Sequence, residues 1–288
     1  MDDYPIYNLS QEIINHYFNE IPNKPKQLFA RGTFPYDNHS VFLTIVGSRN
    51  ATPYGEQVCR KLIEGLRGYP IVIVSGLAVG IDSIAHHAAI DANLSVVAFP
   101  GSGLGEKIIY PRSNYQLAQK ILHANGCIIS EYPENQNGKS WTFPERNRLM
   151  AGIARATLLI EATHKSGSRI TARLATEYNR DVFAVPGDIF RITSEAPNEL
   201  IRMGALPITS SEELLEALGF HITEQPMLDL FPEATSDEQQ VLKLLASPKL
   251  KGDLIRELGI PTHKASVLIS QMELKGFIKD MGGELRRG

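Results

Sequence analysis

Short apolar runs that alternate with segments of helical periodicity constrain the fold of this chain more than any other feature. Six runs of strand length follow one another from residue 41 onward, and most are separated by about 10–15 residues with apolar side chains at helical spacing. Continuous apolar strands that alternate with helices are typical of a parallel sheet with helices on both faces. The sequence therefore predicts an α/β fold with an extended Rossmann-like sheet. The runs are 41–46, 71–74, 95–99, 127–130, 157–160 and 182–185.

The pattern changes after residue 220, which predicts a second, smaller domain. We expect residues 1–40 to form a lead-in to a Rossmann-like core at 41–220. Residues 221–234 contain two prolines and no periodic pattern, and they are the predicted linker. Residues 235–288 hold three short helical patterns and a glycine-separated pair of strands. This order is typical of a winged-helix domain.

Composition excludes several classes of protein. The chain is 43% apolar and 21% charged, as in ordinary globular proteins. Its first residues lack the apolar stretch of a secretory signal peptide, and no apolar run approaches the ~20 residues that span a membrane. We expect a cytoplasmic protein with no membrane contact. Cys59 and Cys127 stand alone, outside any zinc-binding spacing, and are expected to be buried, reduced thiols.

Basic residues are concentrated in one segment. The net charge of the chain is −3, yet residues 139–173 contain seven Lys and Arg against two Glu. Such a local basic field indicates one dedicated anion site. Lys139 to Arg148 also interleaves cations with Trp141 and Phe143. Single-stranded nucleic acids need this combination, because bases stack on rings while cations hold the backbone. The alternative is that both rings are core anchors and the arginines are surface charges.

The loop after the first apolar run could bind phosphate. It reads GSRNAT, in which Gly47 permits a sharp turn and Ser48 and Thr52 can donate hydrogen bonds. Arg49 adds a permanent bidentate donor. In doubly wound sheets, ligands bind beyond the carboxyl ends of the strands, where this loop is expected to lie. A plain turn with a surface arginine is the alternative.

A second anion site is expected where the segment THKSGS precedes a predicted helix. Free backbone N–H groups at a helix start attract anions, and the small residues Ser166, Gly167 and Ser168 leave room for one. Helix capping alone would explain either serine, but it would not explain the adjoining Lys165.

The glycine-rich loop at 100–107 fails the tests for nucleotide motifs. The loop PGSGLGEK ends in Lys107 followed by Ile108, so the hydroxyl that a P-loop needs is missing. No G-x-G-x-x-G opens a helix after the first strand. ATP hydrolysis and NAD binding are therefore disfavoured, and no cofactor is expected. The loop SGLAVG at 75–80 suits close ligand approach and tight packing equally well.

Asp82 and His86 stand four residues apart on a predicted helix. The pair could act as an acid and a base. We favour a simpler interpretation, in which Asp82 caps the helix and His86 makes a local hydrogen bond.

The loops, in this order, resemble those of the DNA-processing protein A family (DprA/Smf). The resemblance implies an extended Rossmann fold that binds single-stranded DNA without sequence preference. It further implies a cytoplasmic homodimer that protects incoming DNA and loads the RecA recombinase in natural transformation. The matching segments include IVGSRNATPYG (45–55), VSGLAVGIDSIAHHAAI (74–90), PGSGLGEKIIYP (100–111), FPERNRLMAGIA (143–154) and LIEATHKSGSRITARLA (159–175).

The same resemblance implies a set of DNA contacts, with no catalytic or metal-binding residue. Four of these cations on phosphates would give a log–log salt dependence of affinity near −3, at about −0.7 per contact. The set is Gly47, Ser48, Arg49, Lys139, Phe143, Arg146, Asn147, Arg148, Lys165, Ser166, Gly167 and Ser168.

Two other functions compete with this interpretation. The glycine loops also resemble those of nucleotide phosphoribohydrolases, which need a carboxylate at the helix start where this chain has Arg169. A nucleotide-sensing regulator with a winged helix is the third possibility. Residues 233–288 hold nine basic and eight acidic residues, so the tail could contact either duplex DNA or a protein.

Overall fold

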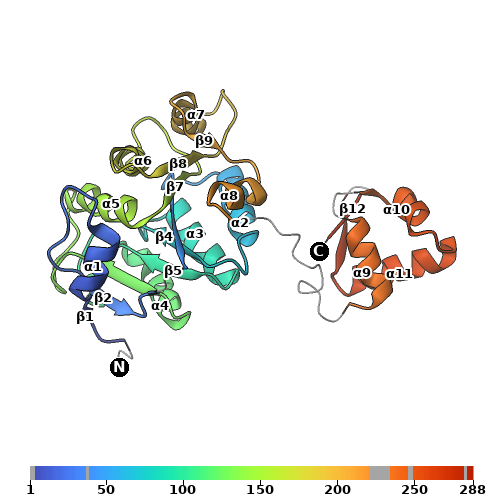
Figure 1. Cartoon of the computed structure of the whole chain (residues 1–288), viewed down its shortest axis with the longest axis horizontal. Coiled ribbons are helices and arrows are strands. Elements are labelled where there is room, and N and C mark those ends of the chain that lie inside the picture. Colours follow the sequence, from blue (N-terminus) through green and yellow to red (C-terminus); the bar gives the residue numbers. More distant parts are fainter. Residues whose placement is uncertain (1–3, 37–38, 221–233, 246–248, 282–283, 288) are drawn as a thin grey trace. The chain divides into compact units, whose positions relative to one another are not determined.

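The apolar runs form the centre of a nine-stranded sheet in the computed structural model of the chain (Figure 1). The strand order is β1-β2-β6-β5-β4-β3-β7-β8-β9, and all pairs from β6 to β9 are parallel. The predicted parallel core is confirmed. The strands are β1 Tyr7–Asn8, β2 Phe29–Gly32, β3 Val41–Val46, β4 Ile71–Ser75, β5 Ser95–Ala98, β6 Cys127–Ser130, β7 Ala156–Leu159, β8 Asp181–Ala184 and β9 Leu206–Pro207.

Helices cover both faces of the sheet because alternate side chains of a strand point to opposite faces. On β3, Leu43 and Ile45 pack with α2, α3, α4 and α8, whereas Phe42 and Val46 pack with α1, α5 and α6. The two predicted helix layers are therefore present. The helices are α1 Gln11–Phe18, α2 Pro53–Glu64, α3 Ile81–Asp91, α4 Tyr115–His123, α5 Thr142–Ile153, α6 Ser168–Glu177, α7 Glu195–Arg202 and α8 Ser211–Ala217, with short 3-10 helices at Arg112–Asn114 and Ile192–Ser194.

Residues 1–40 contribute more than the expected lead-in. Strand β2 pairs antiparallel with β6, with Ala30 opposite Ile129, and β1 extends that edge of the sheet. Helix α1 buries Ile14 and Phe18 completely in the same apolar cluster as α5. The segment therefore completes both the sheet and one helix layer.

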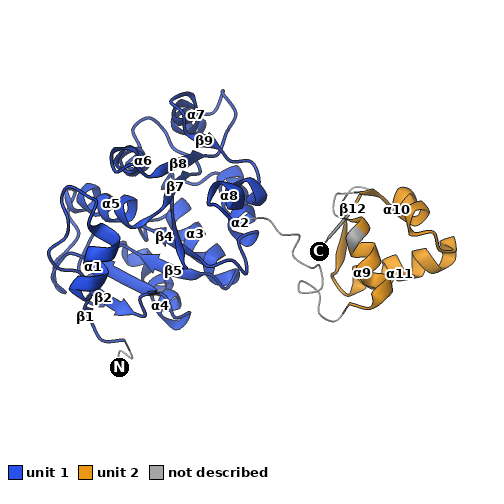
Figure 2. Cartoon of the chain, in the orientation of Figure 1, with its two compact units in different colours: residues 1–221 blue, residues 222–288 orange. Residues whose placement is uncertain are grey.

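The chain divides into two units, Met1–His221 and Ile222–Gly288 (Figure 2). The structure describes residues 4–36, 39–220, 234–245, 249–281 and 284–287, so the predicted linker lies almost entirely outside the described residues. Among those that are described, no helix is both long and apolar enough to cross a bilayer. Cys59 and Cys127 are buried and free, as predicted, and burial raises the pKa of each thiol to about 12.

The second unit contains the three helices and the hairpin that the sequence predicts. A third strand, β10, pairs with β12, and the sheet order is β10-β12-β11. Its core includes Leu242, Leu254 and Ile269. Assignment to the winged-helix class stays a prediction. The elements are α9 Ser236–Leu244, β10 Lys249–Leu250, α10 Lys251–Leu258, α11 Thr262–Leu274, β11 Ile278–Met281 and β12 Glu284–Arg287.

Because Phe18 is fully buried in the main core, Phe18→Ala should lower the free energy of unfolding by about 3–5 kcal/mol. Urea denaturation of the full chain measures the change. The control is Lys26→Ala, at an exposed position of the same segment, which should stay within about 0.5 kcal/mol of the parent. Equal stabilities for the two variants would show that α1 is not part of the cooperative core.

Candidate functional site

The predicted site residues come together beyond the carboxyl ends of the parallel strands. The loop that begins at Gly47 follows β3, and the loop that carries Lys165 follows β7. These strands are neighbours, and the N–H of Ser48 donates to the backbone carbonyl of Glu161 at 2.7 Å. The segment that begins at Lys139 leads into α5. Three segments that are distant in sequence therefore share one edge of the sheet.

Arg49 and Phe143 meet at this edge. The Cζ atom of Arg49 lies 5.7 Å from the centroid of the Phe143 ring. The same ring lies 5.3 Å from the ring of Tyr110 and covers Gly101 so closely that a Cβ there would overlap it. A guanidinium over a ring contributes about 0.5–1 kcal/mol at an exposed site. The structure thus places a cation against an aromatic ring on the surface.

Three cations of the expected set are exposed and unpaired. Arg49, Lys139 and Lys165 each present their charge to solvent. Within the described part of the chain, none of the three side chains has an ion-pair or hydrogen-bond partner. A cation without an internal partner can bind an external anion without first breaking a contact. These three side chains are therefore the available anion-binding groups of the surface.

Arg146 does not lie on the surface, contrary to the expectation of a direct phosphate contact. Its side chain is only 6% exposed, and its guanidinium donates to the carbonyl of Gly76 at 2.6 Å and to the carbonyl of Phe99. Burial lowers the pKa of the guanidinium to about 10, which leaves it charged at neutral pH. Arg146 therefore joins α5 to the ends of β4 and β5.

Asp82 is the buried carboxylate that accompanies Arg146. It accepts hydrogen bonds from the N–H groups of Gly76 at 3.1 Å and Ala78 at 3.4 Å. Burial raises the pKa of Asp82, and the charge of Arg146 opposes that rise. Asp82 thus holds the loop that precedes α3, whereas the N-cap position of that helix belongs to Gly80. The Gly76 peptide groups are fixed by both charges.

The two residues that follow Arg146 are also engaged internally. Arg148 forms an ion pair with Glu131, next to β6, and its side chain is mostly buried. Asn147 is buried, and its Nδ2 donates to the carbonyl of Gly167 at 3.3 Å. This bond ties α5 to the start of α6. The sequence did not reveal these partners, because each lies at least 17 residues away.

The N-terminus of α2 is already occupied by an internal carboxylate. Glu161 accepts hydrogen bonds from the N–H and the Oγ1 of Thr52, both at 2.7 Å. It packs so closely on Gly55 that a Cβ there would overlap the carboxylate. The expected donation from Thr52 to phosphate is therefore wrong. The role of Glu161 was not predicted, although an acid directly after a buried strand is a visible signal in the sequence.

Space remains at the start of α6, but its first N–H groups have internal partners. Its N-cap residue, Gly167, is exposed and has open space around its Cα. The N–H of Ser168 donates to the Oγ of Ser166 at 3.4 Å, and the N–H of Arg169 donates to the carbonyl of Ser166 at 3.2 Å. The expectation of free N–H groups is therefore wrong at these two positions. The hydroxyls of Ser166 and Ser168 lie 2.6 Å apart. Lys165 precedes them and is exposed. This is the arrangement of small residues and one cation that the sequence predicted at a helix start.

The glycines of the loop at 75–80 serve packing. A Cβ on Gly76 would overlap the guanidinium of Arg146, and a Cβ on Gly80 would overlap the backbone of Ser48 and Arg49. Gly80 also has a φ of +80°, which other residues rarely adopt. The sequence had left ligand approach and packing equally open, and the structure favours packing.

His86 is fully buried and does not make the local hydrogen bond that we expected. Neither ring nitrogen has a partner in hydrogen-bond geometry among the described residues. Burial lowers the pKa of the imidazole to about 3, so the ring is neutral at physiological pH. His86 and Asp82 therefore both lie in the interior, and they do not form an exposed acid/base pair. In the described part of the chain, no cluster of His, Cys, Asp and Glu could hold a metal ion.

Replacement of Arg146, whose buried charge compensates Asp82, should lower the stability of the fold far more than replacement of a surface cation. Arg146→Ala leaves Asp82 buried without its counter-charge and should lower the free energy of unfolding by about 3–5 kcal/mol. Arg49→Ala should stay within about 0.5 kcal/mol. The double variant Asp82→Leu/Arg146→Met should be more stable than Arg146→Ala, because it leaves no charge uncompensated. Urea unfolding measures all three, and additive effects would argue against coupling.

His86 should make the fold sensitive to acid. Its pKa is about 3 in the folded chain and ~6.5 when unfolded, so between these values the unfolded state binds the extra proton. The contribution to stability is therefore complete above pH 6.5 and is lost as the pH falls. Between pH 7.5 and pH 5, His86→Leu should gain about 2 kcal/mol of unfolding free energy relative to the parent. A pH-independent difference in urea unfolding would contradict this.

Comparisons with known proteins add independent evidence. The family model for DNA recombination-mediator protein A matches residues 4–219. Protein Smf of Escherichia coli K12 is 36% identical over 269 residues, which cover 90% of this chain and 71% of the relative. DNA processing protein DprA of Bacillus subtilis 168 is 38% identical over 202 residues, which cover 70% of this chain and 67% of the relative.

Two solved structures share the fold. The X-ray structure of DprA from Streptococcus pneumoniae superposes with a TM-score of 0.69 at 34% identity and covers 76% of each chain. A structure of DprA from Helicobacter pylori, described as showing the single-stranded DNA binding mode of that protein, has a TM-score of 0.68 at 30% identity. It covers 76% of this chain and 99% of the other. The chain therefore belongs to the DNA recombination-mediator protein A family, the DprA/Smf family that its sequence motifs indicated.

Proposed function

We propose that this DNA-processing protein binds single-stranded DNA, without sequence preference, along the carboxyl edge of its parallel sheet. The observation that carries the proposal is the exposed, unpaired Arg49 against the ring of Phe143. A ring offers a base a stacking partner whatever the base is, and a guanidinium binds the phosphate that every nucleotide has. The DNA-binding mode described for the Helicobacter pylori relative supports the same ligand.

The surface suits a polymer better than a single nucleotide. Its free cations, Arg49, Lys139 and Lys165, come from three different loops. Phosphate contacts of this kind fix the position of a strand without reading its sequence. Stacking on Phe143 would add about 1–3 kcal/mol per base.

Arg146, Asn147 and Arg148 support this surface and are not its phosphate contacts. Each side chain already has a partner within the chain: Gly76, Gly167 and Glu131 respectively. Within the expected set, and in the described part of the chain, three free cations then remain to displace counterions. The salt dependence of affinity should accordingly have a slope of about −2 instead of −3.

We propose that this binding serves recombination during natural transformation. The protein would protect incoming single strands in the cytoplasm, act as a homodimer and load RecA onto the strand. These roles follow from family membership. A homodimer would present two DNA surfaces to one strand, and binding to linked sites raises the effective affinity.

Replacement of Arg49 should weaken binding equally on every sequence. For the parent protein and oligo-dT, log K against log salt should have a slope of about −2, and Arg49→Ala should reduce its magnitude by about 0.7. The loss should be the same on mixed-sequence oligonucleotides. Arg60→Ala is the matched control, because Arg60 is partly exposed on α2 and paired with Glu56; it should change neither quantity. Fluorescence anisotropy over a range of salt concentrations measures both.

Two results would count against the proposal. Binding of the parent protein that does not depend on salt would exclude phosphate contacts. A loss confined to particular sequences would show that bases are read directly.

A further inference from the structure

The loop after β8 exposes three large apolar side chains within four residues. Ile189 is 82% exposed, Phe190 is 90% exposed and Ile192 is 67% exposed. Single exposed apolar residues are common on protein surfaces, but a group of them marks a binding surface. Neither the sequence motifs nor the proposed contacts account for this group.

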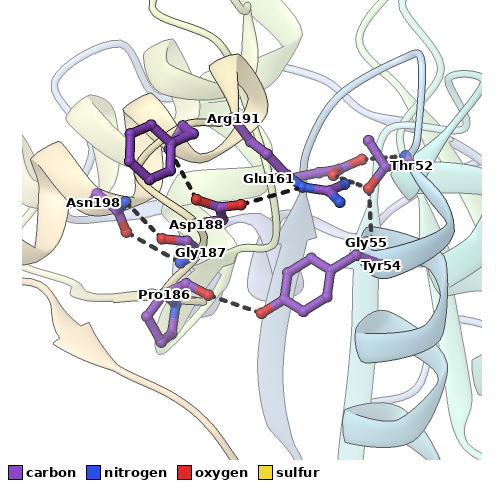
Figure 3. A network of polar contacts seen from close by, with 10 residues as sticks. Thr52, Tyr54, Gly55, Glu161, Pro186, Gly187, Asp188, Arg191 and Asn198 are labelled. Atoms are coloured by element: carbon purple, nitrogen blue, oxygen red, sulfur yellow. Dashed lines mark hydrogen bonds and ion pairs between the residues drawn. The ribbon is translucent and has the colours of Figure 1, made fainter.

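The backbone of this loop is held in place. The side-chain amide of Asn198, on α7, accepts from the N–H of Gly187 at 3.2 Å and donates to its carbonyl at 2.9 Å. The hydroxyl of Tyr54, on α2, donates to the carbonyl of Pro186 at 2.8 Å (Figure 3). The start of the loop, directly before the exposed side chains, is therefore fixed. A fixed loop start reduces the entropy lost when a ligand binds.

The same contacts join the loop to the proposed DNA surface. Tyr54 follows Thr52 by two residues, and Thr52 is bound to Glu161 at the end of β7 (Figure 3). Strand β8 pairs with β7, and β7 pairs with β3. Neighbouring strands lie about 4.8 Å apart, so the ends of β3 and β8 are about 10 Å apart. A few nucleotides of single strand span that distance, whereas a dinucleotide is too short to do so.

The chemistry beside the loop suits a nucleobase. A pocket of about 450 Å³ is lined by Tyr54, Pro186, Gly187, Asp188 and Arg191. The exposed guanidinium of Arg191 lies 3.7 Å from the carboxylate of Asp188, so the pocket combines a ring, a cation and hydrogen-bonding groups. Single strands bind to aromatic and cationic groups in combination, as we propose for Phe143 and Arg49. The connection of this loop to the proposed DNA surface favours DNA as the occupant over a protein.

We propose that the loop at 186–192, with Phe190 and Tyr54, is a second base-stacking platform that extends the DNA-binding surface past β7 to β8. The proposal rests on the proposed function. Phosphates are held at Arg49 and Lys165, and the bases that follow stack at the β8 loop. Short strands fill the first part of the surface only, and longer strands reach the second.

Oligonucleotide length is the test. With the full chain, Phe190→Ala should weaken binding of dT20 roughly fivefold or more, the equivalent of losing one stacked base, and should leave binding of dT2, which is too short to reach the loop from Arg49, unchanged. Phe190→Tyr keeps the ring and should bind dT20 like the parent. Met203→Ala is the matched control, since Met203 is a 73% exposed apolar residue outside the loop, and it should have no effect. Phe190 is almost fully exposed, so its replacement should not impair folding.

The outcomes separate this inference from the proposed function. An equal loss for dT2 and dT20, or no loss for dT20, overturns the second platform. If Phe190→Ala lowers the mass of the protein in light scattering while dT20 binding is unchanged, the loop is a contact between copies and the platform is overturned. Failure of the parent to bind either oligonucleotide overturns the proposed function itself. Weakening by Arg49→Ala without any effect of Phe190→Ala overturns the platform alone.

Discussion

The buried guanidinium of Arg146 is the interaction on which the candidate surface depends. It connects three elements, because its donors reach the carbonyls of Gly76 after β4 and Phe99 after β5 while its backbone belongs to α5. A buried charge of this kind is tolerated only where hydrogen bonds and an opposite charge compensate it, and Asp82 supplies the latter. Phe143 lies three residues earlier on the same helix, so the anchor at Arg146 also fixes where that ring emerges.

Glycines, which have no side chain, make this arrangement possible. Gly76 leaves space for the guanidinium, Gly80 lets its loop touch the loop of Arg49, and Gly101 lets the Phe143 ring approach the backbone closely. Each glycine removes a Cβ where two segments meet. Glycine-rich loops at strand ends usually indicate a nucleotide that approaches the backbone. Here the chain fills that space with its own arginine and phenylalanine, which explains why the loops resemble nucleotide motifs while failing their tests.

The sequence predicted the strands and helices that have a regular pattern of apolar residues. The strands at 41–46 and Cys127–Ser130 were placed to the residue because continuous apolar runs define them. Strand β2 was missed, since four residues that include Arg31 carry no detectable period. At the site, Arg49 and Arg148 looked equivalent, yet one is free and the other is paired with Glu131. The partner that decides this is distant in sequence, so residue type alone could not distinguish them.

Ion pairs within the chain reduce the number of cations that the basic segment can offer to DNA. The segment at 139–173 is strongly basic by composition, but Arg148, Arg169 and Arg173 are each paired with a glutamate of the same chain. Paired cations release few counterions when DNA binds, so they add little to affinity or to its salt dependence. A surface with few free cations and a stacking ring would therefore hold a strand with moderate strength. Moderate binding suits the proposed role, because a protein that passes its strand to a recombinase must also release it.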